Sequence, residues 1–228
     1  MRKILFTASL MAALLGAPAA HAHLEGDLIF RVGAVLVDPR ERSDDIHHQA
    51  LGDIPGTKVT LDHEVQMGMN YLYMLTDNIG VELLAATPFT QELRVKGMPG
   101  PYAGLNGRLG EVEHLPPTLS LVYFPLDDTY DFQPYVGVGF NYTFFFNDKL
   151  SREAKGKGFQ SGLDIDNSYG LSAQIGVDYM ISDQYLINAQ MRYIDIDTKG
   201  TTWLAGGRVD VDVDVDPFVY MLSFGYRF

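Results

Sequence analysis

The last eleven residues of the chain constrain its fold more than any other stretch. Apolar or aromatic side chains occupy every second position from Phe218 to Phe228, which ends the sequence. In a β-strand these side chains share one face. A continuous apolar face with aromatic residues is typical of strands in the lipid-facing wall of a transmembrane β-barrel. An edge strand in a soluble β-sandwich is the alternative that this segment alone leaves open.

The amino-terminal segment has the pattern of an export signal. Arg2 and Lys3 precede a short apolar run over residues 4–16, and Ala20-His21-Ala22 matches an A-x-A cleavage site. The run is too short for a retained transmembrane helix. We therefore expect residues 1–22 to be a signal peptide and residues 23–228 to form one outer-membrane β-barrel.

Composition narrows the possible partners and chemistry. The chain has no cysteine, so the fold depends on backbone pairing and packing without disulfides. Its formal net charge is −12, and removal of Arg2 and Lys3 makes the mature chain more negative. This balance argues against a nucleic-acid partner. No pattern points to a cofactor.

Period-two alternation predicts eight strands along the chain. Two segments, 59–73 and 167–179, show it most clearly, and both exceed the usual strand length of about 5–6 residues. Strands of ~9–11 residues suit a bilayer. In the last strand the apolar phase shifts near Asp216-Pro217, which predicts a β-bulge. The six remaining predicted strands cover residues 27–37, 79–87, 118–124, 134–146, 185–196 and 209–228.

The connections between these strands alternate in length. Residues 76–78, 125–131 and 182–184 are short and turn-rich, whereas residues 38–58, 88–116, 147–166 and 197–208 are long and polar or glycine-rich. Outer-membrane barrels combine short periplasmic turns with long extracellular loops. We therefore predict an all-β fold, an eight-stranded antiparallel transmembrane β-barrel in the bacterial outer membrane.

Short segments spread over nearly the whole mature chain carry a family resemblance. They lie at residues 76–89, 114–118, 134–139, 141–145, 193–197, 216–218 and 225–228. These segments resemble the OmpW family of small outer-membrane barrels, which includes the AlkL-type alkane-uptake proteins. The resemblance implies a barrel that lets small hydrophobic molecules cross the outer membrane through an apolar channel and a lateral exit. Some members of the family serve as colicin receptors.

The inward face of the predicted strands is polar. The interior of an eight-stranded barrel is just wide enough for side chains or one small ligand. We expect Arg31 or Arg192 to pair with Glu82 or Glu64 and to plug the lumen, because an unpaired buried charge is costly. The alternative is that these residues only stabilise a closed barrel. The inward set is Arg31, Glu64, Gln66, Asn70, Glu82, Asn141, Gln174, Asp178, Asn188 and Arg192.

At the extracellular ends of the strands, the side chains at inward-facing positions are more apolar. Val35, Leu84, Ala86 and Phe145 lie there, and Trp203 in the last long loop is expected to cover the mouth. An apolar solute gains roughly 0.8 kcal/mol for each methylene withdrawn from water. These residues therefore predict an apolar vestibule that captures small hydrophobic solutes. Packing of the loops into a lid is the alternative.

Prolines suggest a lateral exit from that vestibule. Pro88 ends the third predicted strand, and Pro116 and Pro117 begin the fourth. Proline donates no backbone hydrogen bond, so missing pairs there open a gap toward lipid. The alternative is that these prolines only terminate the strands.

Other features bear on partners and rival functions. Phe224, Tyr226 and Phe228 resemble the assembly signal that the barrel-assembly machinery reads. Further expected partners are outer-membrane lipids, lipopolysaccharide and small hydrophobic solutes. A structural, adhesive or receptor barrel without transport remains the main alternative function.

Catalysis and metal binding have little support in the sequence. Ser120 or Ser172 with His63 or His114 fits no recognisable catalytic motif, so we expect no enzyme. The alternating aspartates in residues 209–216 offer a cation site, but they are spaced too widely to share one ion and favour a solvated rim. We also expect residues 44–48, with two histidines, to hold no metal.

Overall fold

The barrel wall consists of eight antiparallel strands in the computed structural model, which describes residues 23–228. Each strand pairs with the next, and the last pairs with the first, so the sheet closes without an edge. Closure gives every wall strand a partner on both sides, as a hydrocarbon environment demands. The predicted all-β, eight-stranded barrel is thereby confirmed. The wall strands are β1 (Leu28–Asp38), β6 (Glu64–Met74), β7 (Ile79–Ala86), β10 (Thr118–Tyr123), β11 (Phe132–Leu150), β13 (Ser168–Met180), β14 (Tyr185–Ile194) and β17 (Phe218–Arg227).

The outer face of the wall is apolar because alternate side chains point away from the lumen. Val138, Leu171 and Leu222 are 67%, 69% and 65% exposed, although each belongs to a regular ladder. A soluble protein would bury such a continuous set. Lipid is therefore the solvent that fits this surface.

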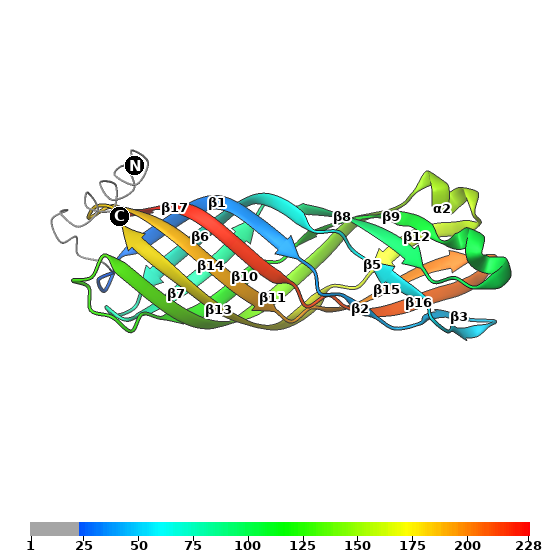
Figure 1. The fold of residues 1–228 in the computed structure, drawn as a ribbon, viewed down its shortest axis with the longest axis horizontal. Coiled ribbons are helices and arrows are strands. Elements are labelled where there is room, and N and C mark those ends of the chain that lie inside the picture. The colour runs from blue at the N-terminus through cyan, green and yellow to red at the C-terminus, as the bar shows by residue number, and fades with distance from the viewer. Residues whose placement is uncertain (1–22) are drawn as a thin grey trace, which may run out of the picture.

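Both ends of the barrel sequence lie at one end of the molecule (Figure 1). The backbone N–H of Phe228 donates to the carbonyl of Leu28 over 2.9 Å. The short connections, residues 75–78, 124–131 and 181–184, lie between strands at this end. This arrangement agrees with a periplasmic end of short turns.

The long connections fold into two small sheets beyond the barrel, at the opposite end in Figure 1. In the first, β5 (Lys58–Thr60), β8 (Phe89–Lys96) and β9 (Gly107–Leu115) extend the upper part of β11. The second has the order β12 (Phe159–Ile165), β15 (Asp197–Leu204), β16 (Gly207–Asp214), β3 (Ile46–His48) and β4 (Gly52–Ile54). Strand β2 (Arg42–Ser43) also pairs with β16. The short helices η1 (Gly100–Leu105) and α2 (Arg152–Gly156) complete this extracellular extension.

The prediction of one bulged strand over residues 209–228 is wrong. Strand β16 ends at Asp214 and β17 begins at Phe218. Between them Asp216 adopts a φ of 40°, and Pro217 follows. This conformation breaks the ladder, and β16 pairs with β15 in the extension while β17 stays in the wall. The second predicted strand is likewise divided, into β5 and β6.

The expected signal peptide, residues 1–22, lies outside the described residues. Within residues 23–228, no helix is long and apolar enough to cross a membrane.

Two apolar clusters lie at different levels inside the molecule. The lower one fills the periplasmic end of the lumen and comprises Ile29, Leu72, Met74, Val122, Phe124, Tyr135, Met180 and Leu186. The upper one joins the extracellular ends of the wall strands to the two small sheets. The polar lumen residues belong to neither cluster.

Candidate functional site

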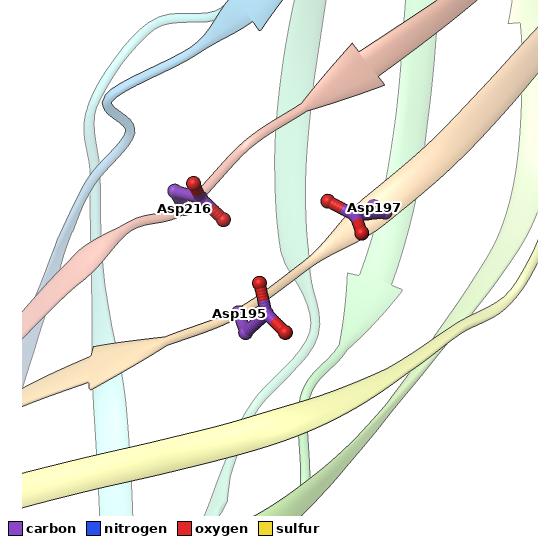
Figure 2. A group of neighbouring side chains, drawn as sticks. All are labelled: Asp195, Asp197 and Asp216. Carbon is purple, nitrogen blue, oxygen red and sulfur yellow. The ribbon is translucent and has the colours of Figure 1, made fainter.

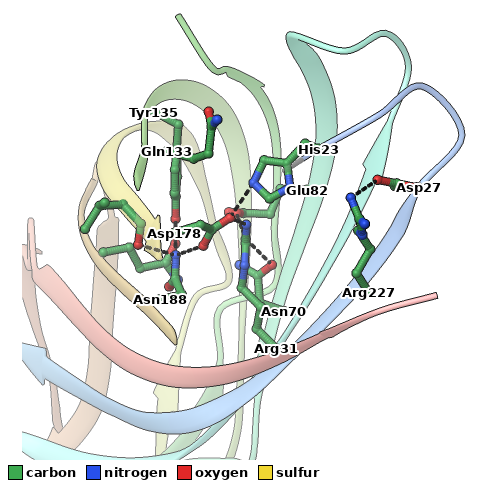
Figure 3. A network of polar contacts seen from close by, with 12 residues as sticks. His23, Asp27, Arg31, Asn70, Glu82, Gln133, Tyr135, Asp178, Asn188 and Arg227 are labelled. Carbon is green, nitrogen blue, oxygen red and sulfur yellow. Dashed lines mark hydrogen bonds and ion pairs between the residues drawn. The ribbon is translucent and has the colours of Figure 1, made fainter. Parts of the chain in front are cut away.

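A charged network occupies the barrel lumen (Figure 3). Arg31 Nη1 lies 3.0 Å from Glu82 Oε2 and 3.2 Å from Asn70 Oδ1, and Nη2 of the same guanidinium pairs with Asp178. Arg192 pairs with the other oxygen of Glu82. All four charged side chains are at most 1% exposed. Two positive and two negative groups therefore neutralise one another in a region shielded from bulk solvent.

Further polar side chains extend this network toward the periplasmic end. Asn188 Nδ2 donates to Asp178 over 2.8 Å and to the Tyr135 hydroxyl over 3.0 Å. His23 Nε2 lies 2.8 Å from Asp178, and its ring packs edge-on against Phe124. Our sequence reasoning missed both His23 and Tyr135. Tyr135 occupies an inward-facing position in the alternating pattern of its strand, so the pattern could have identified it. Nothing in the sequence marks His23 as a lumen residue.

The structure brings most, but not all, of the predicted lumen residues together. Both arginines pair with Glu82, and Gln174 donates to it over 2.9 Å. Glu64 and Gln66 lie instead near the extracellular end of β6, half-buried, and Glu64 forms no ion pair with another described residue. Asn141 bonds to Thr118 and to the Pro117 carbonyl, at the level where β10 begins.

The lumen is therefore filled in its periplasmic half. The charged network spans the interior, and the lower apolar cluster lies next to it, with Tyr135 shared by both. An eight-stranded barrel leaves little room beyond its own side chains. Straight passage of a solute toward the periplasm would require this network to open.

An apolar cavity of about 80 Å³ lies in the extracellular extension. It is bordered by the wall at Val37, Ile194 and Val219 and by both small sheets. A single buried water needs roughly 10–15 Å³ of such space, so the cavity has room for a small molecule. Its apolar lining from the two sheets includes Ile46, Val59, Leu93, Val95, Leu109, Val112, Phe159, Leu163, Val209 and Val213.

The predicted vestibule residues divide between this cavity and its surroundings. Phe145 lines the cavity. Val35 and Leu84 are buried in the upper cluster, and Ala86 packs against it. Trp203 is a paired residue of β15, is 42% exposed and is not among the lining residues. The segment around Trp203 forms a hairpin instead of a covering loop.

Polar side chains interrupt the apolar lining, and Gln91, His114 and Thr202 are the buried ones among them. The His114 ring stacks on Phe89 with 5.3 Å between centroids and lies 5.7 Å from the Phe145 ring. Burial of this ring lowers the pKa of His114 to about 4, so the imidazole is neutral near pH 7. Gln91 and Thr202 escaped the sequence analysis because they lie in segments expected to be loops.

A seam interrupts the backbone ladder beside the cavity. The β7–β10 ladder ends at Leu84 opposite Thr118, and the β8–β9 ladder starts at Phe89 opposite His114. Within the described chain, no ladder pair joins residues 85–88 to residues 115–117. The prolines Pro88, Pro116 and Pro117 lie in this interval, and Pro116 also lines the cavity.

The other side of the same segment remains bonded. Leu115 is opposite Phe144 on β11, and Tyr142 N–H donates to the Pro117 carbonyl over 3.2 Å. The missing pairs are therefore confined to the side facing β7 and β8. Because proline lacks an N–H, these positions cannot restore the ladder by a small shift.

An acidic group lies at the junction of the wall and the extension, where β14 passes to β15 and β16 passes to β17 (Figure 2). Asp195, Asp197 and Asp216 place carboxylate oxygens within 4.8 Å of one another. Asp216 already accepts from Arg42 over 3.3 Å and from the Ile196 N–H over 3.4 Å. Burial and the neighbouring carboxylates raise the pKa of Asp197.

Of the other aspartates in residues 209–216, Asp214 hydrogen-bonds to Asp197, whereas Asp210 and Asp212 lie beside a lysine. Lys199 lies 3.1 Å from Asp210 and 3.5 Å from Asp212. The run is thus neutralised in part by a lysine on the neighbouring strand. Farther out, His47 bonds to Asp53 over 2.7 Å, and both side chains are exposed.

Comparisons with known proteins agree with this architecture. Outer membrane protein W of Escherichia coli strain K12 is 39% identical over 228 residues, all of both chains. Outer membrane protein AlkL of Ectopseudomonas oleovorans is 29% identical over 177 residues, 78% of this chain and 72% of that protein. The crystal structure of OprG from Pseudomonas aeruginosa has a TM-score of 0.85 and 43% identity, and the match covers 92% of this chain and 99% of OprG.

These relatives are outer-membrane proteins, and the closed barrel with its apolar wall fits the same location. The chain is therefore a protein of the bacterial outer membrane, in contact with its lipids. Residues 24–228 match the OmpW family, to which this chain belongs.

Proposed function

We propose that this barrel is a channel for small hydrophobic molecules, which bind in the extracellular cavity and leave sideways into the membrane. The observation that carries the proposal is the position of the apolar cavity: the filled lumen lies below it, and Pro116 of the interrupted ladder is in its lining. We also propose that residues 1–22 are removed on export. No step of the proposed transport is catalytic.

The driving force for capture is the hydrophobic effect. Each methylene that moves from water into the cavity gains about 0.8 kcal/mol. Lipopolysaccharide at the cell surface is charged and excludes such solutes. An apolar cavity on the extracellular side of the barrel gives them an alternative route.

The direction of release follows from comparing two barriers. Movement toward the periplasm requires separation of Arg31 and Arg192 from Glu82, and breaking one buried pair costs about 3–5 kcal/mol. Movement through the seam breaks no ladder pair between residues 85–88 and 115–117. The sideways path also ends in hydrocarbon, where an apolar solute is stable.

Lipopolysaccharide around the extension and the barrel-assembly machinery are the further partners that we propose. The assembly signal consists of Phe224, Tyr226 and Phe228 on β17 and at its end. Phe224 and Phe228 are 48% and 71% exposed, so their rings are accessible to a partner.

Uptake by vesicles tests the channel. Vesicles with lipopolysaccharide in the outer leaflet would carry the purified protein, and the fluorescence rise of N-phenyl-1-naphthylamine would report uptake of an apolar solute. We expect the protein to accelerate this uptake while a trapped polar dye, calcein, is retained. Calcein release would indicate an aqueous pore, and unchanged uptake of the apolar probe would contradict the proposal.

A pair of variants on one strand links uptake to the cavity. Leu93 on β8 lines the cavity, whereas Thr90 on the same strand is exposed on the opposite face. Leu93→Asp should abolish the acceleration because it places a charge in the apolar space. Thr90→Asp introduces the same charge outside and should leave uptake unchanged. A shift in gel mobility on heating verifies that both variants fold.

A structural, adhesive or receptor role is the second candidate. The two extracellular sheets, which project beyond the wall in Figure 1, favour it because they offer a large surface above the membrane. A correctly folded barrel that fails to accelerate uptake, yet binds to cells or ligands through residues 38–58 or 147–166, would support this function instead.

A further inference from the structure

The apolar cavity contains buried polar atoms that the protein itself does not satisfy. Gln91 Oε1, His114 Nδ1 and Thr202 Oγ1 have no hydrogen-bond partner within residues 23–228. Their side chains are 3%, 7% and 4% exposed, and all three line the cavity. Buried polar groups are nearly always paired in folded proteins, so three orphans around one cavity need an explanation.

The three side chains come from both small sheets. On β8 and β9, Phe89 is opposite His114 and Gln91 is opposite Val112, so Gln91 and His114 are diagonal neighbours. Diagonal neighbours lie about 7–8 Å apart, within reach of one small ligand group. Thr202 on β15 is opposite Val209, which also lines the cavity. Polar atoms thus border the same space from two sides.

Their chemistry matches a neutral group that both donates and accepts. The Gln91 oxygen accepts, the Thr202 hydroxyl does either, and the neutral His114 ring offers one donor and one acceptor nitrogen. Asp210 also borders the cavity, but its charge is taken up by Lys199 at 3.1 Å and Arg208 at 3.6 Å. The remaining lining carries no charge that would hold an ionic ligand.

We propose that the cavity selects small neutral alcohols, with an apolar body and one hydroxyl group, over hydrocarbons of the same length. The inference rests on the proposed function and specifies its substrate class. Water is able to pair with the three polar atoms, and an alcohol that displaces it replaces the lost hydrogen bonds. A hydrocarbon leaves the same atoms buried and unpaired, which is unfavourable.

Titration of the full chain in lipid nanodiscs tests this selectivity with 1-octanol and n-octane. The NMR methyl signals of Leu93 and Val112, which line the cavity, would report the Kd of each ligand. The decisive variant is Gln91→Leu with Thr202→Val, which removes polar atoms at nearly constant volume and keeps the stacked His114. Its ratio of the octane Kd to the octanol Kd should fall roughly tenfold from the wild-type ratio.

Both ligands also partition into the lipid. This partitioning changes the Kd ratio of every variant by the same factor, so it cancels when the ratios of two proteins are compared. A matched control is Gln160→Leu with Thr90→Val, which makes the same changes at exposed positions of β12 and β8. This control should retain the wild-type ratio. An unchanged ratio in the cavity variant would overturn the proposal.

A measurement on the wild-type protein covers the case in which the variant does not fold. Octanol should shift the side-chain amide signal of Gln91 and the ring-nitrogen signals of His114, whereas octane should shift the methyl signals alone. Equal responses to both ligands would overturn the selectivity and leave the channel proposal intact. Binding of neither ligand would instead count against the proposed function itself.

Discussion

Arg31 and Glu82 form an ion pair across the lumen, 3.0 Å between Nη1 and Oε2, although β6 separates their strands in the wall. Both side chains are fully buried. Glu82 also holds Arg192, so one carboxylate serves two guanidinium groups. Asp178 provides the second negative charge. A buried network of this kind is tolerable only while its charges balance.

Neutralising Glu82 should therefore destabilise the barrel strongly. In Glu82→Gln both arginines keep their charge, but Arg31 retains only Asp178 and Arg192 loses its carboxylate partner; an uncompensated buried charge costs about 3–5 kcal/mol. We expect the free energy of unfolding to fall by about 3 kcal/mol or more in urea titrations in lipid vesicles. Glu64→Gln is the control, because Glu64 is half-buried and outside the network, and it should change this free energy by less than about 0.5 kcal/mol.

The stability of the extension should depend on pH through His114. Desolvation lowers the pKa of His114 to about 4, below the ordinary value of 6.5. The folded ring therefore binds fewer protons than the unfolded one between these values, and stability must decrease as pH falls from 6.5 toward 4. Between pH 7 and pH 4.5 the loss from this group is about 2 kcal/mol.

Unfolding titrations at these two pH values measure that loss, and His114→Phe isolates it. Phenylalanine keeps an aromatic ring between Phe89 and Phe145 but does not titrate. The variant should lose about 2 kcal/mol less stability than the wild-type protein over the same pH interval. Equal losses in both proteins would show that His114 titrates with its ordinary pKa in the folded protein.

Periodicity was a good guide to the wall and a poor guide to the extension. The outward residues of β13 and β17 alternate without interruption, because lipid demands an apolar side chain at every second position. Residues 207–214 alternate equally well, yet they pair with β15 outside the wall. Alternation indicates an extended segment with two different faces; it does not state which sheet that segment joins.

Most residues that line the cavity were not predicted from the sequence, for a related reason. The sequence predicts a long connection over residues 88–116, although Phe89, Gln91, Leu93 and Val95 alternate and line or adjoin the cavity. The polar residues between them masked this inner face. The charged network was easier to anticipate, since a charge on the inward phase of a narrow barrel must find a partner. His23 lies outside the strands and had no such signal.

The proline seam should control the rate of uptake rather than capture. Replacing Pro88 and Pro117 with valine supplies N–H donors in the interval where no ladder pair joins β7–β8 to β9–β10. If solutes leave there, Pro88→Val with Pro117→Val should slow uptake of an apolar probe several-fold, with unchanged Kd in the cavity. Pro101→Val, at an exposed position of η1, should affect neither quantity. Uptake at the wild-type rate in the double variant would contradict a lateral exit.

The final residue should matter for assembly more than for stability. The Phe228 side chain is 71% exposed, and its ring lies 4.8 Å from that of Tyr226. Its main backbone contact, the N–H donated to Leu28, does not depend on the side chain. We therefore expect Phe228→Ala to change the free energy of unfolding in vesicles by no more than about 0.5 kcal/mol.

In cells, the same variant should reduce several-fold the amount of folded protein in the outer membrane if the terminal aromatic residue is recognised during assembly. Phe132→Ala removes another exposed aromatic ring, at the start of β11, and should leave assembly unchanged. A parallel loss of assembly and stability in Phe228→Ala would assign the residue a packing role instead.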